Sequence, residues 1–107
     1  MDFSSYQDGA RKTALYPEAA KIIYPALGLA GEAGEVANQV KKILRDNAGE
    51  LTPERRAKII DELGDVLWYA AALATDIGIS LEEVAAENLA KLAKRYDSGT
   101  IQGDKRE

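Results

Sequence analysis

The sequence predicts an all-α fold, a compact and bundle-like domain of four to five helices. Apolar residues recur at helical spacing through most of the chain, and no run of alternating apolar and polar residues is long enough to suggest a sheet. The length of 107 residues, with 46% apolar and 30% charged residues, fits one globular domain. Because so small a domain buries a limited share of its surface, we expect the chain to form an oligomer.

The first two expected helices lie in the N-terminal half. The first covers residues 4–15 and ends before Tyr16-Pro17, since a residue that precedes proline is disfavoured in helical conformation. The second begins near Pro25, a favourable first helical position, and ends near residue 45, before a cluster of helix-breaking residues. Residues 18–24 fit either a helical turn or a separate short helix.

Two further helices have clear start signals. The third begins after Thr52, a suitable N-cap that a proline follows, and ends at about residue 77, before Gly78. Ser80 and Glu83 have the spacing of a capping box, which opens a fourth helix. That helix is expected to end near Tyr96.

Residues 1–96 therefore form the expected helical domain, and residues 97–107, with two glycines and several charges, form a C-terminal tail. No stretch approaches the roughly 20 apolar residues of a membrane span, and the first residues do not resemble a signal peptide. We therefore expect a cytoplasmic protein that does not bind membranes. The net charge of −4 and the lack of a basic run argue against double-stranded nucleic acid as a partner.

The chain contains neither cysteine nor histidine. Thiol nucleophiles, disulfides, histidine-ligated zinc and Ser-His-Asp catalysis are therefore excluded. Any catalytic base must be a carboxylate, a lysine, a tyrosine or a metal-bound hydroxide.

Two acidic pairs supply such carboxylates, Glu32 with Glu35 and Glu62 with Asp65. Each pair has i, i+3 spacing along the edge of an apolar helix face, so the four side chains can converge where the two helices pack. Taken alone, each pair is typical of a solvated helix surface. Together they predict a site for Mg²⁺, with Mn²⁺ as an alternative, because hard oxygen ligands suit these ions and uncompensated buried carboxylates are costly.

Polar residues on other helix edges are candidates for binding a substrate. Lys42 continues the edge of Glu32 and Glu35, and Tyr69 lies on the edge of the second acidic pair as a wall of the site. On the fourth helix Asn88, Lys91 and Arg95 share one flank, although cations near a helix C-terminus are also typical of solvated helix ends.

These motifs resemble a known family. Residues 27–35, Leu-Gly-Leu-Ala-Gly-Glu-Ala-Gly-Glu, and residues 62–69, Glu-Leu-Gly-Asp-Val-Leu-Trp-Tyr, are similar to the Glu-x-x-Glu and Glu-x-x-Asp signature of MazG-type nucleoside triphosphate pyrophosphohydrolases. Their all-α superfamily includes phosphoribosyl-ATP pyrophosphohydrolases and dimeric dUTPases. Residues 88–96 resemble the segment that closes the site, and residues 99–106 resemble the tail of short MazG-like proteins, including phage versions.

The resemblance implies hydrolysis of a (d)NTP to the monophosphate and pyrophosphate, with Mg²⁺ or Mn²⁺ essential. It makes Glu32, Glu35, Glu62 and Asp65 the metal ligands, and gives Glu35 in particular the role of orienting or deprotonating the attacking water. Basic residues would hold the phosphate chain and an amide would contact phosphate or sugar; by position these are Lys42, Lys91, Arg95 and Asn88. It also implies a dimer or tetramer whose sites a neighbouring subunit helps to complete, with the tail ordering over substrate.

Three alternatives remain open at this point. Two are enzymes of the same superfamily, a dUTPase-like activity and a phosphoribosyl-ATP pyrophosphohydrolase. The third is a non-catalytic helical oligomer in which the acids bind a structural or regulatory ion. No motif in the sequence identifies the base of the substrate.

Overall fold

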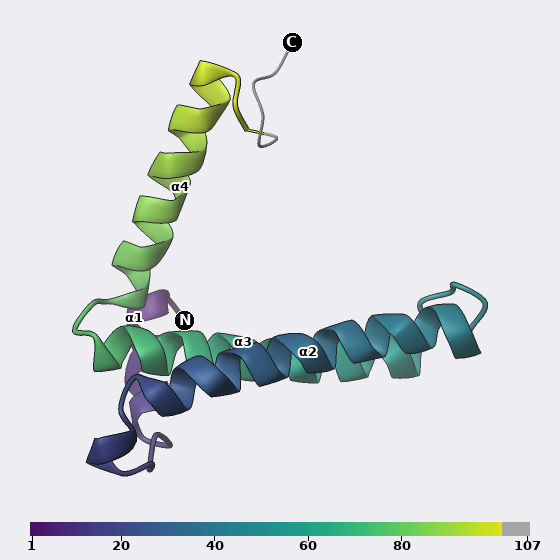
Figure 1. Cartoon of the computed structure of the whole chain (residues 1–107), viewed down its shortest axis with the longest axis horizontal. Helices are drawn as coiled ribbons and strands as arrows, with labels where there is room; N and C mark the ends of the chain where they lie inside the picture. Colours follow the sequence, from purple (N-terminus) through teal and green to yellow (C-terminus); the bar gives the residue numbers. More distant parts are fainter. Residues whose placement is uncertain (102–107) are drawn as a thin grey trace.

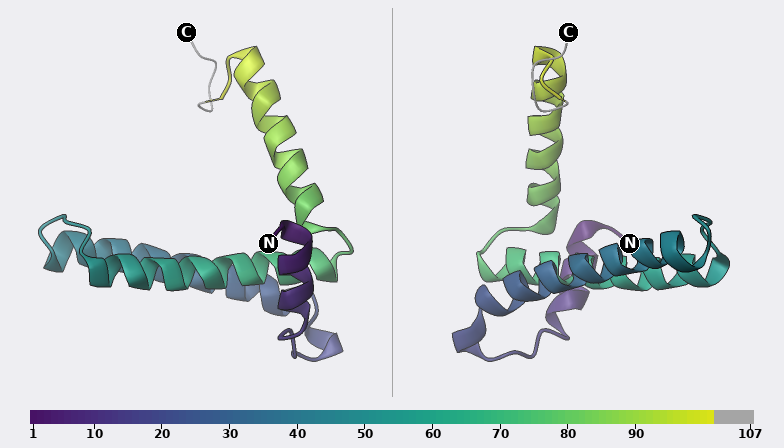
Figure 2. Two further views of the ribbon diagram at one scale, coloured as in Figure 1. Left: turned by 180° about the vertical axis from the view of Figure 1, so that it is seen from behind. Right: turned by 45° about the vertical axis from the view of Figure 1, so that its right-hand side comes forward.

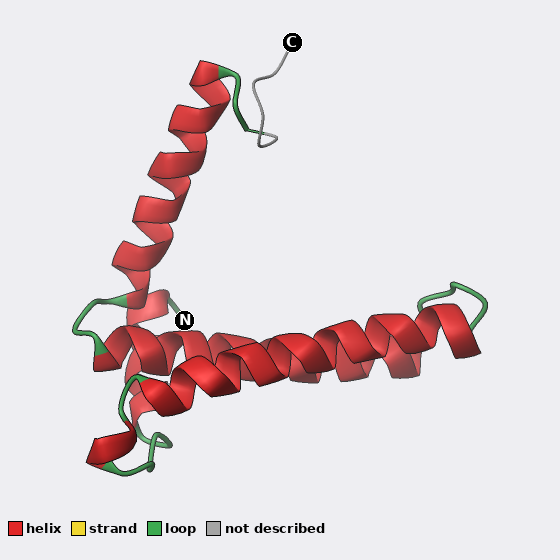
Figure 3. Cartoon of the chain, viewed as in Figure 1, coloured by secondary structure: helices red, strands yellow, loops and turns green. Residues whose placement is uncertain are grey.

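The computed structural model describes residues 1–101, and their all-α class confirms the prediction (Figure 3). No strand occurs among these residues. The elements in chain order are α1 (Phe3–Arg11), the short 3-10 helix η1 (Glu18–Ala20), α2 (Ile23–Asp46), α3 (Pro53–Asp76) and α4 (Leu81–Ser98). The expected ordering of the tail over substrate falls mainly on residues 102–107, which lie outside the described part.

The two longest helices form the body of the molecule. α2 and α3 lie antiparallel and side by side along their length, and α1 crosses them near the end where α3 meets α4 (Figures 1 and 2). At the opposite end Arg55 closes the hairpin by donating to Gln39 Oε1 at 2.9 Å and to Asn47 Oδ1 at 3.2 Å. The hairpin is therefore tied at its tip by hydrogen bonds between side chains.

α4 leaves this hairpin at a steep angle and extends away from it in every view (Figures 1 and 2). The radius of gyration is 16.9 Å, whereas a compact domain of this length has about 13 Å. None of the described helices is long and apolar enough to cross a membrane.

Local signals placed several helix ends correctly. Thr52 is the N-cap of α3 and accepts from the Arg55 backbone N–H at 3.2 Å, and Ser80 caps α4 through the Glu83 N–H at 3.1 Å. Gly78 follows α3 with a φ of 80°, a conformation that glycine adopts without steric cost. These boundaries follow from chemistry within four residues, which explains why the sequence predicts them.

The end of α1 was predicted four residues too late. The helix ends at Arg11, and Thr13 donates its hydroxyl to the Ala10 carbonyl at 3.1 Å while accepting from Trp68 Nε1 at 2.8 Å. The contact with α3 therefore sets this boundary. The 3-10 turn η1 resolves the alternative for residues 18–24, and α2 begins at Ile23, two residues before the expected position.

A small core joins three helices at the α1–α3–α4 corner. It consists of Ala10, Ala71 and Leu81, with Tyr6 and Trp68 packed against it. Gln7, only 2% exposed, donates to Thr75 Oγ1 and the Ile79 carbonyl and accepts from the Leu81 N–H. Since all its polar atoms are satisfied, this buried amide fixes the direction in which α4 leaves α3.

Outside that corner, much of the apolar surface is exposed. Val40, Leu63 and Leu89 are large apolar residues of the long helices, yet Leu63 is 51% and Leu89 68% exposed, and Val40 is exposed as well. Because α4 does not cover the hairpin, these residues stay exposed within residues 1–101. Further large apolar residues are exposed on the same long helices: Ile23, Leu27, Leu44, Ile60 and Leu67.

Gly28 makes one close approach possible. A Cβ atom at this position would overlap the ring of Tyr69, so that only a hydrogen fits between α2 and this ring. By contrast, a Cβ atom added at Gly31, Gly34 or Gly64 would meet no atom within 4 Å. Among these four glycines, Gly28 is therefore the one at which a neighbouring side chain occupies the space that a Cβ atom would fill.

We predict that Gly28→Ala lowers the free energy of unfolding by about 1–3 kcal/mol, because the Tyr69 ring must move. Gly9→Ala is the matched control, since a Cβ atom there meets open space and helix propensity favours alanine by up to about 1 kcal/mol. Denaturant unfolding of both variants tests this. Equal stability of Gly28→Ala and wild type would contradict the close packing.

Candidate metal centre

Three carboxylates meet at the interface of α2 and α3. Glu32 of α2 and Glu62 and Asp65 of α3 each offer an oxygen, and these three oxygens lie within 4.8 Å of one another. Glu32 and Glu62 are half-buried and Asp65 is exposed. The i, i+3 spacing places Glu62 and Asp65 on one face of α3, and the antiparallel packing brings Glu32 against that face.

The charge of Glu32 disturbs Glu62. A hydrogen bond with Glu32 raises the pKa of Glu62, and partial burial and the Glu32 charge act in the same direction. In the metal-free protein this shift favours the protonated form of Glu62. A divalent cation would replace that proton and neutralise more of the charge.

The donor set fits Mg²⁺ or Mn²⁺. All three groups supply hard oxygen ligands of the kind that Mg²⁺ and Mn²⁺ bind. Their oxygens already lie within 4.8 Å of one another, so they could serve one cation. Carboxylates in this number leave coordination positions for water and phosphate, as is usual for magnesium sites that bind phosphorylated substrates.

Glu35, the fourth expected ligand, lies outside this group of three. It follows Glu32 by one turn of α2 and is exposed to solvent. Its carboxylate is therefore near the site without being part of the three-oxygen cluster. As a ligand or as a base for water, Glu35 remains a prediction.

Two tyrosines lie beside the acids. Tyr69 is half-buried against Gly28, and burial raises the pKa of its hydroxyl, with a hydrogen bond to Tyr24 and the charges of Glu32 and Asp65 adding to the rise. Tyr6 of α1 is a neighbour that the sequence did not indicate; burial raises its pKa and the charge of Asp65 contributes. As a wall of the site, Tyr69 stays a prediction.

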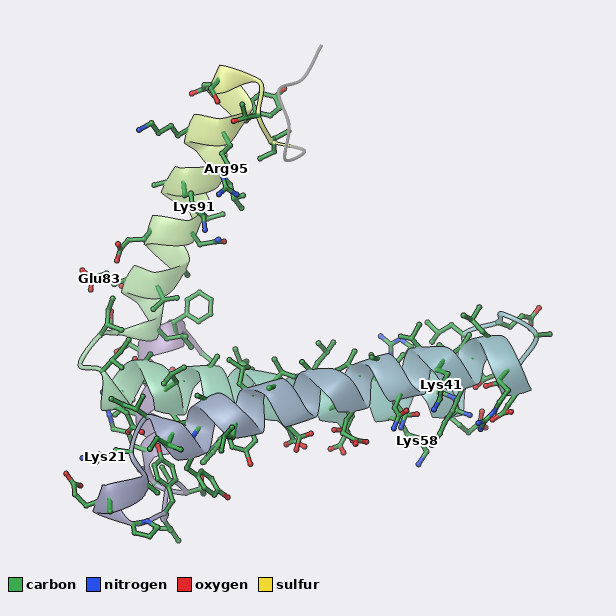
Figure 4. The ribbon with its side chains drawn as sticks, viewed as in Figure 1. Lys21, Lys41, Lys58, Glu83, Lys91 and Arg95 are labelled. Atoms are coloured by element: carbon green, nitrogen blue, oxygen red, sulfur yellow. The ribbon has the colours of Figure 1, made fainter. Side chains whose placement is uncertain are left out.

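The expected basic residues do not surround the acids within one chain. Lys42 lies ten residues after Glu32, about 15 Å along the helix, and its charge acts on Asp46. Lys91 and Arg95 lie on α4, which leads away from the hairpin (Figure 4). Asn88 and Lys91 instead line an open groove together with Ile79, Val84 and Glu87.

Asp76 has a role that the sequence did not reveal. Its Oδ2 accepts from the Tyr16 hydroxyl at 2.8 Å and from the Ile22 backbone N–H at 2.9 Å. Burial raises the pKa of Tyr16 to about 12, and the hydrogen bond to Asp76 adds to the rise, so this hydroxyl remains a donor at neutral pH. Asp76 thereby ties the loop before α2 to the end of α3.

Comparisons with known proteins cover most of the chain. The family described as MazG nucleotide pyrophosphohydrolase domain matches residues 25–100. Gene 37 protein of Mycobacterium phage L5 is 48% identical over 109 aligned residues, which cover 96% of each chain. Uncharacterized protein YvdC of Bacillus subtilis (strain 168) is 39% identical over 71 residues, 62% of this chain and 67% of YvdC. No solved structure matches the chain significantly.

The carboxylate cluster predicts a pH-dependent effect of metal. Because the raised pKa of Glu62 favours the protonated carboxyl in the folded state, its ionised form opposes folding above that pKa, and a bound cation relieves this cost. We expect Mg²⁺ to raise the melting temperature at neutral pH, and this shift to shrink as the pH falls through the raised pKa. Thermal unfolding followed by circular dichroism measures it.

The variant Glu62→Gln should remain folded without metal and lose the Mg²⁺-dependent shift, because it lacks both the repulsion and the ligand. Asp61→Asn removes one charge from the same helix outside the cluster and should keep the shift. Identical Mg²⁺ responses in these two variants and in wild type would exclude the proposed ligand set.

Proposed function

The chain belongs to the MazG nucleotide pyrophosphohydrolase family, and we propose that it is a metal-dependent enzyme that hydrolyses a (d)NTP to the (d)NMP and pyrophosphate. The observation that carries this proposal is the cluster of Glu32, Glu62 and Asp65, which lies inside the matched segment. The chain has no histidine or cysteine to act as a catalytic group. Carboxylates that hold Mg²⁺ can support hydrolysis of a phosphate anhydride in their place, because the metal stabilises phosphate charge and activates water.

Glu32, Glu62 and Asp65, with Glu35 as the fourth acid, would hold the cation. When bound, Mg²⁺ or Mn²⁺ would screen the phosphate charges and lower the pKa of a coordinated water. Glu35 is exposed beside the cluster, which suits it to accept a proton from the attacking water. The water oxygen forms a bond to phosphorus of the α–β anhydride, the bridging P–O bond breaks, and pyrophosphate leaves.

The same carboxylates would serve the narrower alternatives. A dUTPase-like enzyme and a phosphoribosyl-ATP pyrophosphohydrolase cleave the same kind of bond, so they differ in what the site accepts beyond the phosphates. A non-catalytic oligomer that binds a regulatory ion would retain metal binding without turnover. The ordinary or damaged nucleotides of the cytoplasm are the substrates that we favour.

We further propose that the working form is a dimer or tetramer. Exposed apolar faces of α2, α3 and α4 support this assembly, as does a radius of gyration well above that of a compact domain. Contiguous apolar surface of this kind usually marks a protein interface. Gln7 fixes α4 away from its own hairpin, which leaves the α4 flank available to a neighbouring copy.

Charge supports the same arrangement. The acids of the hairpin need cations to bind a phosphate chain, and the flank of α4 carries Lys91 and Arg95 beside Asn88. These residues would enter the site of the neighbouring subunit, where the lysine and the arginine would bind phosphate and the amide would contact phosphate or sugar. Lys42 would serve the outer end of the phosphate chain.

A nucleotide panel tests the activity directly. We expect wild type with Mg²⁺ to release pyrophosphate from at least one NTP or dNTP, and Glu35→Gln and Asp65→Asn to reduce the rate by about 100-fold or more. Asp61→Asn, which keeps the three-oxygen cluster, should retain the wild-type rate. Absence of turnover with every nucleotide, together with a Mg²⁺-induced rise in melting temperature, would favour the non-catalytic alternative.

Mixing two inactive variants tests whether subunits share a site. Glu62→Gln lacks a proposed ligand of the hairpin, and Lys91→Ala lacks one of the proposed phosphate-binding cations of α4. If each site uses the hairpin of one chain and α4 of another, refolding the two together restores about a quarter of wild-type activity, because half of the dimers are mixed and each mixed dimer has one intact site. No recovery, or a stable monomer in light scattering at micromolar concentration, would refute this assembly.

A further inference from the structure

We infer that the ring of Tyr24, supported by Tyr16 and Tyr69, is the platform on which the base of the nucleotide stacks. This inference rests on the proposed function, because it assigns the end of the site that binds the nucleoside once the carboxylates bind the phosphates. None of these rings has a role in holding the cation, and Tyr16 and Tyr24 were not singled out by the sequence.

The three rings form a continuous cluster. Tyr16 and Tyr24 are stacked, with ring centroids 4.8 Å apart and an angle of 19° between their planes. Tyr69 follows at 6.1 Å from Tyr24 with a tilt of 46°, and Trp68 meets Tyr69 edge-on at 5.0 Å. These separations are typical of favourable aromatic pairs, so each ring restrains its neighbour.

One face of the cluster is open. Tyr24 is 46% exposed although Tyr16 is stacked on it, so much of the remaining ring surface is accessible to solvent. Ile23 and Leu27 beside it are also exposed, which makes the surroundings apolar. A half-exposed ring on a stack that is already formed can accept one more planar aromatic group without rearranging.

The backbone just before α2, at Ile22, has a strained conformation, and Tyr24 follows it by two residues. Ile22 has a φ of 69° and a ψ of −53°, and the Ile23 N–H donates to the Lys21 carbonyl at 2.7 Å. This is a γ-turn with positive φ at a β-branched residue, which is rare and costly. Asp76 holds the turn through the Ile22 N–H and holds Tyr16 through its hydroxyl. Strain of this kind persists where the surrounding contacts fix it, often at ligand sites.

The register of α2 connects the platform to the carboxylates. Tyr24, Gly28 and Glu32 are spaced i, i+4 and i+8, so they follow one face of the helix over about 12 Å. The Tyr69 ring packs against Gly28, between Tyr24 and Glu32 along the helix. The proposed base and metal ends of the site therefore lie about two turns of α2 apart, on either side of the Tyr69 ring.

This chemistry favours a class of ligand rather than one base. Stacking on an aromatic ring is available to every nucleobase because each has a π-face, and it contributes a similar amount for each. The platform therefore selects nucleotides over phosphate chains that lack a base. It leaves the choice among bases to groups at the edge of the stacked ring.

The test compares two ligands that differ in the nucleoside. Binding of an α,β-methylene dNTP analogue and of inorganic tripolyphosphate is measured by calorimetry in Mg²⁺, with wild type, Tyr24→Leu and Tyr24→Phe. We expect Tyr24→Leu to weaken the analogue about tenfold and to leave tripolyphosphate unchanged. Tyr24→Phe should bind both ligands as wild type does, because it keeps the ring.

Unchanged binding of the analogue to Tyr24→Leu overturns the platform, and so does an equal loss of both ligands, which would show that Tyr24 acts through the fold. If Tyr24→Leu does not fold, Tyr24→Trp replaces it: equal or tighter binding of the analogue supports stacking, and weaker binding overturns it. A wild-type protein that hydrolyses no nucleotide and does not bind the analogue would instead refute the proposed function.

Discussion

The packing of α2 against α3 brings like charges together, and this constraint organises the site. Glu32 meets Glu62 and Asp65 where the helices touch, and the rise in the pKa of Glu62 reflects the resulting cost. A helical hairpin optimised for stability would place neutral or opposite charges there. A divalent cation would remove this repulsion. Under the proposed function, the feature that weakens the metal-free hairpin is therefore the one that would give it affinity for metal and phosphate.

Within residues 1–101, the isolated chain also leaves part of its apolar surface uncovered and holds Lys91 and Arg95 away from its acids. Both deficits have one cause, since Gln7 directs α4 away from the hairpin at the α1–α3–α4 corner. Folding α4 back would bury Leu63 and Leu89, but it would break hydrogen bonds of a buried amide. A second copy can satisfy both needs at once by laying its own α4 across the hairpin. In this view the oligomer completes both the core and the site.

The parts of the fold that the sequence predicted are those decided locally. The caps at Thr52 and Ser80 and the acidic spacing on α3 depend on residues within one helical turn. The end of α1 depends on Thr13 meeting Trp68, 55 positions away, and the start of α2 depends on Asp76, 54 positions beyond Ile22. No periodicity encodes such contacts. The exposure of Leu89 could not be predicted for a related reason. Helical spacing identifies an apolar face and does not say which chain covers it.

This division between local and distant contacts has a functional consequence. The spacing of Glu62 and Asp65 is fixed within α3, and the packing of α2 brings Glu32 to them. The tyrosine platform depends instead on a strained turn that Asp76 holds from the end of α3. Changes around Ile22 can therefore re-aim Tyr16 and Tyr24 while the ligands of the cation stay in place. Under the proposed function, the two ends of the substrate would be bound by different contacts, so changes at this turn would weaken stacking of the base and leave the carboxylates in place.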